Sequence, residues 1–428
     1  MKTATIYDVI GIGIGPFTLG LAALAYDIPT LKCIFFDEKD SFNWHPGLLL
    51  PNARLQVPFY ADLVTLADPC SQFSYLAFLK FKRRLFRFAI HENNFATRLE
   101  YNSYCKWVAG QLNNLHFGMQ CQAIHYNKDE ECYDVYLFNK QTRNTFLFKS
   151  KRIVMGIGTT PLIPECAKEI KHPFVFHSGN YLQYKDSILS KQRISIIGSG
   201  QSAGEIFHDL LPYSQTFNLK WFTRSPRFYP MEYSKLSLEM TSPDYVDHFY
   251  SLAAQKKPAI LKEQSVLYKG INFSLINEIY DQLYLLSLDE KNQLPGLFTN
   301  CELKGIKAFA ENLQMQFLQQ ETNELFETSS DVIILATGYM YQVPEFIQPI
   351  KGLINWSAGN YQLNRNYSID NNNSLFVQNA ELHSHGYNSA DLGLGPYRNA
   401  IILNSILGYD HFILERNVAF QSFGGKGG

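Results

Sequence analysis

Two segments of the chain, about 190 residues apart, share one pattern: an apolar β-branched run, a glycine-rich turn and a helix-like stretch. The turns read Gly11-Ile-Gly13-Ile-Gly15-Pro16 and Gly198-Ser-Gly200-Gln-Ser-Ala-Gly204. This pattern opens a Rossmann βαβ unit, in which glycines let backbone N–H groups approach a pyrophosphate at a helix N-terminus. A single match could reflect close helix packing alone. Two matches, each flanked by a strand and a helix, predict two dinucleotide sites.

The residue after the second strand of each unit distinguishes the two sites. Asp37 follows the apolar run 32–36, and a carboxylate there accepts hydrogen bonds from a ribose 2′-hydroxyl, so the first site suits FAD or NAD. Arg224 follows the run 218–223, and a guanidinium can neutralise a 2′-phosphate, so the second site suits NADPH. A plain surface cation is the alternative interpretation of Arg224. One flavin and one NADPH together indicate a flavoprotein oxidoreductase.

Two later apolar strands also end in glycine, at 153–158 and 332–338, which suggests that one nucleotide domain is inserted in the other. We therefore expect an α/β fold with two Rossmann-like domains. The boundaries we expect are 1–187 and 331–428 for the FAD-binding domain, 188–330 for the NADPH-binding domain, and a small, mostly helical substrate-capping region around 230–290.

Composition excludes several other classes. The 38 basic and 39 acidic residues leave a net charge of −1, so nothing draws the chain toward nucleic acid. No signal peptide or transmembrane segment is recognisable, and we expect a cytoplasmic protein. The seven cysteines are scattered without a CxxC pair, which argues against a disulfide reductase and a zinc site, and no metal is expected.

A series of short motifs follows in order along about residues 5–410. They are Phe42-Asn-Trp44-His45-Pro46-Gly47, Leu55-Gln56-Val-Pro-Phe59-Tyr60-Ala61-Asp62-Leu63, Thr97-Arg98-Leu-Glu100-Tyr, Thr223-Arg224-Ser225-Pro226, Gly270-Ile-Asn272-Phe, Ala336-Thr337-Gly338 and His385-Gly386. Together they resemble the siderophore-type lysine/ornithine N-monooxygenases. The resemblance implies that NADPH reduces FAD, that O₂ forms a C4a-hydroperoxyflavin, and that a neutral primary amine leaves as a hydroxylamine for siderophore biosynthesis. That family tends toward homo-dimers and homo-tetramers.

The resemblance also implies residue roles. For FAD, the expected residues are Gly11, Gly13, Gly15, Pro16, Asp37, Trp44, His45, Gln56, Arg98 and Leu392. For NADPH, they are Gly198, Gly200, Gln201, Ser202 and Arg224. Asn272 is expected between the nicotinamide ribose and the substrate amine, and Asn272 and Gln56 are the expected catalytic residues. Ordinary structural packing is the alternative for Trp44 and His45.

The chain departs from the family's amino-acid-using members at two positions. Those members bind the substrate α-carboxylate with a lysine where this chain has Ala61 and with an asparagine where it has Leu238. A buried carboxylate without partners costs several kcal/mol, so we expect a substrate that lacks one: putrescine, cadaverine, diaminopropane or histamine. Tyr60, Ala61, Leu238 and Asn272 are the expected substrate-binding residues.

A diamine keeps a second ammonium, which calls for a carboxylate in the pocket, and neither changed position supplies one. The wall of Tyr60, Ala61 and Leu238 slightly favours a neutral, flat far end such as the imidazole of histamine, unless an acid converges from elsewhere in the fold. The expected function is FAD- and NADPH-dependent N-hydroxylation of such an amine with O₂. The alternatives are a lysine or ornithine N-monooxygenase, a non-catalytic NADPH- and FAD-binding sensor, and a flavin monooxygenase acting on sulfur or a ketone.

Overall fold

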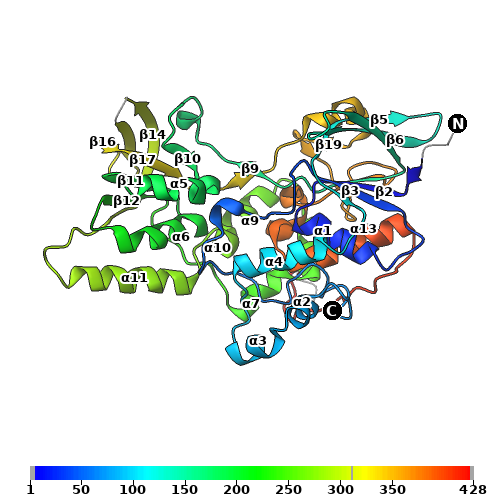
Figure 1. Ribbon diagram of the computed structural model, residues 1–428, viewed down its shortest axis with the longest axis horizontal. Coiled ribbons are helices and arrows are strands. Elements are labelled where there is room, and N and C mark those ends of the chain that lie inside the picture. The colour runs from blue at the N-terminus through cyan, green and yellow to red at the C-terminus, as the bar shows by residue number, and fades with distance from the viewer. Residues whose placement is uncertain (1–4, 310–311, 425–428) are drawn as a thin grey trace.

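The computed structural model describes residues 5–309 and 312–424. Two lobes, each built on a five-stranded parallel sheet, lie side by side in an elongated molecule (Figure 1). The first sheet has the order β21 (Leu375–Val377), β8 (Ile153–Met155), β2 (Val9–Ile12), β3 (Cys33–Phe36), β4 (Leu115–His116). The second has the order β10 (Val175–His177), β17 (Val332–Leu335), β11 (Arg193–Ile197), β12 (Asn218–Phe222), β13 (Gly296–Phe298).

Both lobes repeat one three-layer arrangement of helices, parallel sheet and a second sheet of mainly antiparallel strands, which the two-residue strand Ile6–Tyr7 joins by parallel pairing in the first lobe. In the first lobe the layers outside the parallel sheet are α1 (Pro16–Ala25), α4 (Arg98–Ala109) and α13 (Leu394–Leu407), and β1 (Ile6–Tyr7), β5 (Met119–Asn127), β6 (Cys132–Asn139) and β7 (Thr145–Ser150). In the second lobe they are α5 (Tyr181–Ile188), α6 (Gln201–Leu210) and α11 (Phe273–Ser287), and β14 (Cys301–Ala308), β15 (Leu313–Gln319) and β16 (Glu324–Ser330).

The alternation of side chains along each buried strand explains these layers. In β2, Val9 packs with the helices, whereas Ile10 and Ile12 pack with the antiparallel sheet. Successive side chains of a strand point to opposite faces, so a strand that is apolar throughout can support a layer on each side. The repeated architecture confirms the two Rossmann-like units that the glycine turns predict.

The strand pairing differs from the expected domain boundaries. Val332–Leu335 was expected in the first domain, but it pairs in parallel with residues 194–197 of β11. On its other side it pairs in parallel with Val175–His177, which was also expected in the first domain. An apolar run that ends in glycine suits either sheet, and only tertiary pairing decides between them. We therefore propose boundaries near residues 174 and 336 for the inserted domain.

Short helices fill the space between the lobes. They are α7 (Lys235–Leu238), α8 (Pro243–Ser251), α9 (Lys257–Glu263), α10 (Ser265–Tyr268) and α12 (Leu382–His385). Tyr245 and Phe249 of α8 pack against Tyr387 from the C-terminal part of the first lobe, so the segment expected to cap the cleft does join the two lobes.

The remaining elements are short. They are α2 (Tyr75–Phe81), α3 (Leu85–His91), the ribbons β9 (Thr160–Pro161) with β18 (Tyr339–Met340) and β19 (Trp356–Ser357) with β20 (Asn360–Tyr361), and the 3₁₀ helices η1 (Pro46–Leu48), η2 (Glu165–Ala167), η3 (Ser178–Asn180), η4 (Leu211–Tyr213), η5 (Glu239–Thr241), η6 (Glu345–Leu353) and η7 (Tyr387–Ala390). Within the described ranges, no helix is long and apolar enough to cross a membrane.

A loop of the first lobe takes part in the core of the second. Leu48, Leu50 and Ala53 belong to the apolar cluster that contains Tyr181 and Ile188 of α5. The approach is close: a Cβ on Gly47 would lie 1.8 Å from the carbonyl oxygen of Gly179. The loop 46–53 is thus fixed to the second lobe, although its ends belong to the first.

Candidate active site

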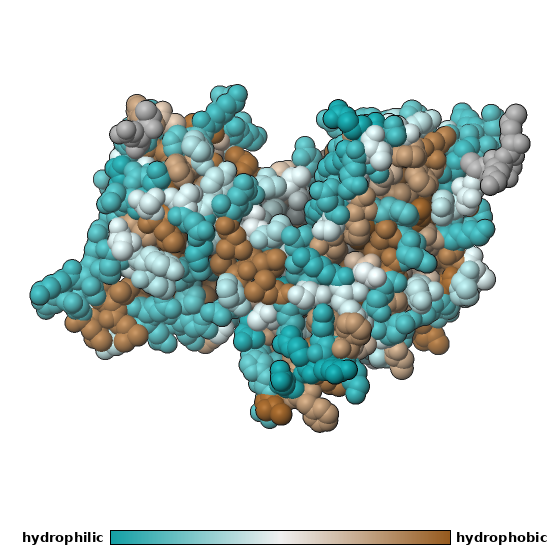
Figure 2. Space-filling view, in the orientation of Figure 1, coloured by the Kyte–Doolittle hydropathy of each residue, from teal (hydrophilic) through white to brown (hydrophobic). Residues whose placement is uncertain are grey.

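A cleft of about 3870 Å³ runs between the lobes and reaches both glycine turns. Figure 2 shows the notch that separates the two lobes on one face of the molecule. With the exception of Gly11, every residue expected from the sequence to bind FAD, NADPH or substrate lines this cleft.

The first glycine turn leaves open space in front of α1. Gly13 has a φ of +88°, and a Cβ there would lie 2.5 Å from the carbonyl oxygen of Gly156, so this position requires glycine. A Cβ on Gly15, the N-cap of α1, would meet no protein atom within 4 Å. Pro16 follows as the first helical residue, where its missing N–H costs nothing. The open side of the turn fits a pyrophosphate held by backbone N–H groups.

Gly11 lies elsewhere than expected. It belongs to β2, and a Cβ there would lie 2.2 Å from Cδ1 of Phe35 on the neighbouring strand. Its role is therefore close packing within the sheet, and the turn that faces the cleft begins at Gly13. Because Gly11, Gly13 and Gly15 are equally spaced, the sequence alone does not show whether the turn begins at Gly11 or at Gly13.

Asp37 ties the end of β3 to this turn. Its Oδ2 accepts the N–H of Ile14 at 2.6 Å and its Oδ1 accepts the N–H of Lys39 at 2.8 Å. A carboxylate has about four acceptor sites, so Asp37 can still accept ribose hydroxyls from the cleft. Asp37 thus fits the role predicted for it.

The flavin-side residues lie farther along the same cleft. Nε2 of Gln56 is buried without a hydrogen-bond partner in the part of the chain that the structure describes, and a flavin acceptor atom would satisfy it. His45 has a φ of +48°, and its ring packs edge-on against Trp44. The ring of His45 is exposed to the cleft, yet the protein packed around it, with Arg98 and Lys39 adding positive charge, lowers the pKa of His45 to about 4. The imidazole is therefore neutral at physiological pH.

The second glycine turn repeats the first. Gly198 has a φ of +141°, and a Cβ there would lie 2.1 Å from the carbonyl oxygen of Ala336. A Cβ on Gly13 would meet the carbonyl oxygen of Gly156 in the same way. Gly200 is the N-cap of α6, and the atom nearest to a Cβ there is the carbonyl oxygen of Lys269 at 3.5 Å. Gln201 and Ser202 begin α6 beside the turn.

Arg224 lies at the cleft, two residues beyond the end of β12. Its side chain is exposed, and within residues 5–309 and 312–424 it forms no salt bridge. A guanidinium in this place fits the 2′-phosphate of NADPH, as predicted.

A partly buried chain of polar side chains connects the two lobes. Arg98 of α4 pairs with Glu205 of α6 at 2.7 Å, and Glu205 also accepts a hydrogen bond from Nε2 of Gln201 at 2.8 Å. The N–H of Asn272 donates to Oε1 of Gln201 at 2.8 Å. Sequence reasoning missed Glu205. The signal was a carboxylate among the apolar residues that follow a glycine turn, and Glu205 is only 4% exposed.

Asn272 caps α11 and faces Tyr233. Its Oδ1 accepts the N–H of Ser274 at 2.9 Å, so its Nδ2 is the group left for the cleft. The hydroxyl of Tyr233 is buried and lacks a hydrogen-bond partner among the described residues. Burial raises the pKa of Tyr233 to about 12, Asn272 opposes this shift, and the Asp391 carboxylate adds to it. Asn272, Tyr233 and Asp391 therefore lie at one part of the cleft.

Ala61 lines the same part of the cleft as Asp391. A Cβ placed on Gly393 would lie 3.0 Å from Oδ1 of Asp391 and 3.5 Å from Cβ of Ala61. Ala61 is 3% exposed, whereas Tyr60 and Leu238 are 46% and 44% exposed. The apolar wall therefore borders a carboxylate, which sequence reasoning did not select although Asp391 immediately precedes Leu392.

Comparison with known proteins shows the family of the chain. A family model described as L-lysine 6-monooxygenase/L-ornithine 5-monooxygenase matches residues 5–341. A putrescine N-hydroxylase of Shewanella oneidensis is 48% identical over 422 residues, which cover 98% of this chain and 84% of that one.

Two solved structures are similar over nearly their whole length. The cadaverine monooxygenase of the desferrioxamine pathway from Erwinia amylovora, bound to FAD, has a TM-score of 0.96 and 44% identity, covering 99% of this chain and 100% of that one. The ornithine N-hydroxylase of Kutzneria sp. 744, with reduced FAD, NADP⁺ and L-ornithine, has a TM-score of 0.88 and 25% identity, covering 94% and 99%.

Proposed function

Because the chain belongs to the L-lysine 6-monooxygenase/L-ornithine 5-monooxygenase family, and so is an FAD- and NADPH-dependent N-monooxygenase, we propose that it hydroxylates one amino group of a short aliphatic diamine for siderophore biosynthesis. The observation that carries the choice of substrate is the pair of apolar residues, Ala61 and Leu238, at the cleft. Neither can bind the α-carboxylate of lysine or ornithine.

Two further observations favour a diamine over histamine, which the apolar wall alone slightly favoured. Relatives at 48% and 44% identity are named for putrescine and cadaverine, respectively. The wall also includes the carboxylate of Asp391, which suits a second ammonium better than a neutral ring.

The protein's part in the reaction is to bind and orient. When bound and reduced by NADPH, FAD would activate O₂, so that one oxygen atom of O₂ passes to the amine and the other leaves as water. Gly13 and Gly15 leave room for its pyrophosphate, and Gln56 offers it a buried N–H donor. Arg224 favours NADPH over NADH. Asn272 is an amide that presents Nδ2 to the cleft, so it positions its partners and does not act as a base.

The test is hydroxylamine formation by FAD-loaded protein with NADPH and a series of amines: putrescine, cadaverine, diaminopropane, histamine, lysine and ornithine. NADPH oxidation and hydrogen peroxide are measured in parallel, because oxidation without hydroxylamine means uncoupled turnover. Product from a diamine, and little from the amino acids, supports the proposal. Product mainly from lysine or ornithine would show that another residue binds the carboxylate, and the proposed substrate would be wrong.

The cytoplasmic location and the homo-oligomeric state stay predictions. Cell fractionation tests the first, and size-exclusion chromatography with light scattering tests the second.

A further inference from the structure

We propose that Asp391 binds the ammonium group at the non-reacting end of the diamine and thereby selects diamines over monoamines of equal length. This inference rests on the proposed function, because it concerns the far end of that substrate. It assigns a specificity-determining role to a carboxylate that the sequence analysis did not select.

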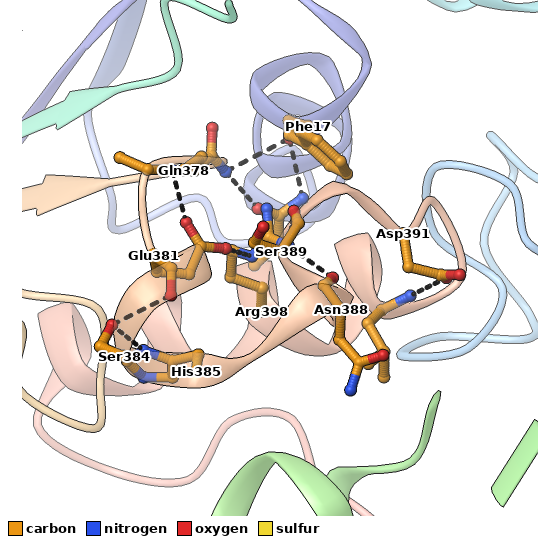
Figure 3. Close-up of polar contacts among 12 residues, drawn as sticks. Phe17, Gln378, Glu381, Ser384, His385, Asn388, Ser389, Asp391 and Arg398 are labelled. Carbon is orange, nitrogen blue, oxygen red and sulfur yellow. Dashed lines mark hydrogen bonds and ion pairs between the residues drawn. The ribbon is translucent and has the colours of Figure 1, made fainter. Parts of the chain in front are cut away.

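Asp391 lies where such an ammonium would arrive. It occupies the turn between η7 and α13 and lines the cleft, where both its Oδ1 and the methyl group of Ala61 lie close to Gly393. Figure 3 shows its carboxylate apart from the Glu381–Arg398 pair, at the edge of the group of polar contacts. Tyr233 and Asn272 line the same cleft, and the charge of the Asp391 carboxylate adds to the raised pKa of Tyr233. The carboxylate is thus close to the part of the cleft assigned to the substrate amine.

One oxygen of Asp391 is free for a ligand. Oδ1 accepts the N–H groups of Gly393 and Leu394 at 2.7 and 3.2 Å, whereas Oδ2 has no hydrogen-bond partner in the described part of the protein. Asp62, next to Ala61, is different: its carboxylate already accepts four hydrogen bonds from residues within 64–75. Of these two neighbouring acids, only Asp391 has an oxygen left for substrate.

Arg398, the cation whose charge acts on Asp391, pairs with another carboxylate. Arg398 lies 2.9 Å from Glu381 and donates to the carbonyl oxygen of Ser389 at 2.5 Å, as Figure 3 shows. Burial raises the pKa of Asp391, and the N–H groups of Gly393 and Leu394, followed by the charge of Arg398, only partly oppose the shift. A half-buried carboxylate with no cation of its own gains most from a cationic ligand, because a charge-assisted hydrogen bond is stronger away from water.

Glu232 is a weaker candidate for the same role. It precedes Tyr233 and lines the cleft, but its side chain is exposed and accepts the N–H of Ser234 at 2.8 Å. Water screens a charge in that position, so it discriminates less between a diamine and a monoamine.

The test compares Asp391→Asn with the wild type on putrescine and on butylamine, which has the same carbon chain without the second amine. Asparagine keeps an acceptor for the two backbone N–H groups and removes only the charge. The expected result is a KM for putrescine raised about 10- to 100-fold, with the KM for butylamine nearly unchanged. Calorimetric binding of putrescine to the FAD-loaded, NADP⁺-bound protein should weaken by the same factor.

The matched control is Glu239→Gln. That carboxylate is bound by the N–H groups of Phe420 and Gln421, and Glu239 does not line the cleft. Its removal should leave the preference for putrescine over butylamine intact. Asp391→Glu, which keeps the charge, should retain part of the preference.

The outcomes separate the two proposals. A wild type that forms hydroxylamine from no diamine would refute the proposed function. A wild type that hydroxylates diamines, while Asp391→Asn keeps its preference for putrescine, would overturn the role of Asp391 alone. If Asp391→Asn fails to fold or to bind FAD, the wild type still decides: equal kcat/KM values for putrescine and butylamine would show that no residue recognises the second ammonium.

Discussion

Replacing Gly15 by alanine should weaken FAD binding without destabilising the protein. A Cβ at this position meets no protein atom within 4 Å, and the backbone of Gly15 is extended, so the folded chain accommodates alanine. The methyl group would enter the space in front of α1 that the pyrophosphate needs. Forcing a methyl group into a filled contact costs about 1–3 kcal/mol, which corresponds to roughly 5- to 150-fold weaker FAD binding.

Gly13→Ala is the matched contrast. Here the added Cβ would lie 2.5 Å from the Gly156 carbonyl oxygen, and the φ of +88° is strained for any L-residue. The left-handed backbone alone costs about 1–2 kcal/mol, and the clash adds to it, so the apoprotein itself should be less stable. Urea denaturation of the apoprotein measures stability, and quenching of flavin fluorescence measures FAD affinity. A Gly15→Ala protein that binds FAD as tightly as the wild type would refute the placement of the pyrophosphate.

Four further results are expected. Ala61→Lys combined with Leu238→Asn should lower kcat/KM for the preferred diamine at least about 10-fold, since a cation then competes for the same carboxylate; unchanged kinetics would place both residues outside the pocket. Arg224→Ala should raise the KM for NADPH far more than the KM for NADH, and equal effects would contradict the 2′-phosphate assignment. Glu205→Gln leaves a buried guanidinium without its counter-charge, so urea denaturation should show a loss of about 3 kcal/mol; a loss near zero would mean that the pair contributes nothing. The lowered pKa of His45, about 4, means that the unfolded chain takes up this proton first, so stability present at neutral pH is lost as pH falls from about 6.5 toward 4; a His45→Gln apoprotein should lose less stability over that range, and identical pH dependence would show an ordinary pKa.

The parts of the site that local spacing determines could be predicted from the sequence. A strand, a glycine turn and a helix specify where a phosphate binds, and the residue after the next strand faces the ribose because neighbouring parallel strands end at one edge. Asp37 and Arg224 were predicted in this way, and both line the cleft, while their roles toward the two nucleotides stay predictions.

Features that depend on long-range pairing could not be predicted. Ala61 and Asp391 are 330 residues apart, and both lie beside Gly393 only because the turn before α13 packs on the loop of Ala61. The strand 332–335 carries no local mark of the sheet it joins, which is why the expected boundary was misplaced. Gly11 shows the same limit at short range, because packing against Phe35 decides that it lies inside a strand.

The loop 46–53 couples the position of the second lobe to the proposed flavin site, because it is packed in the core of that lobe. Trp44 and His45 precede this loop and Gln56 follows it, while Leu48, Leu50 and their neighbours are packed into the core beside α5. If Trp44, His45 and Gln56 surround the isoalloxazine ring, as we propose, a shift of the second lobe when nucleotide binds or leaves should move these side chains. Nucleotide exchange should therefore be visible as a change in the visible absorption or fluorescence of the bound flavin, with no added label.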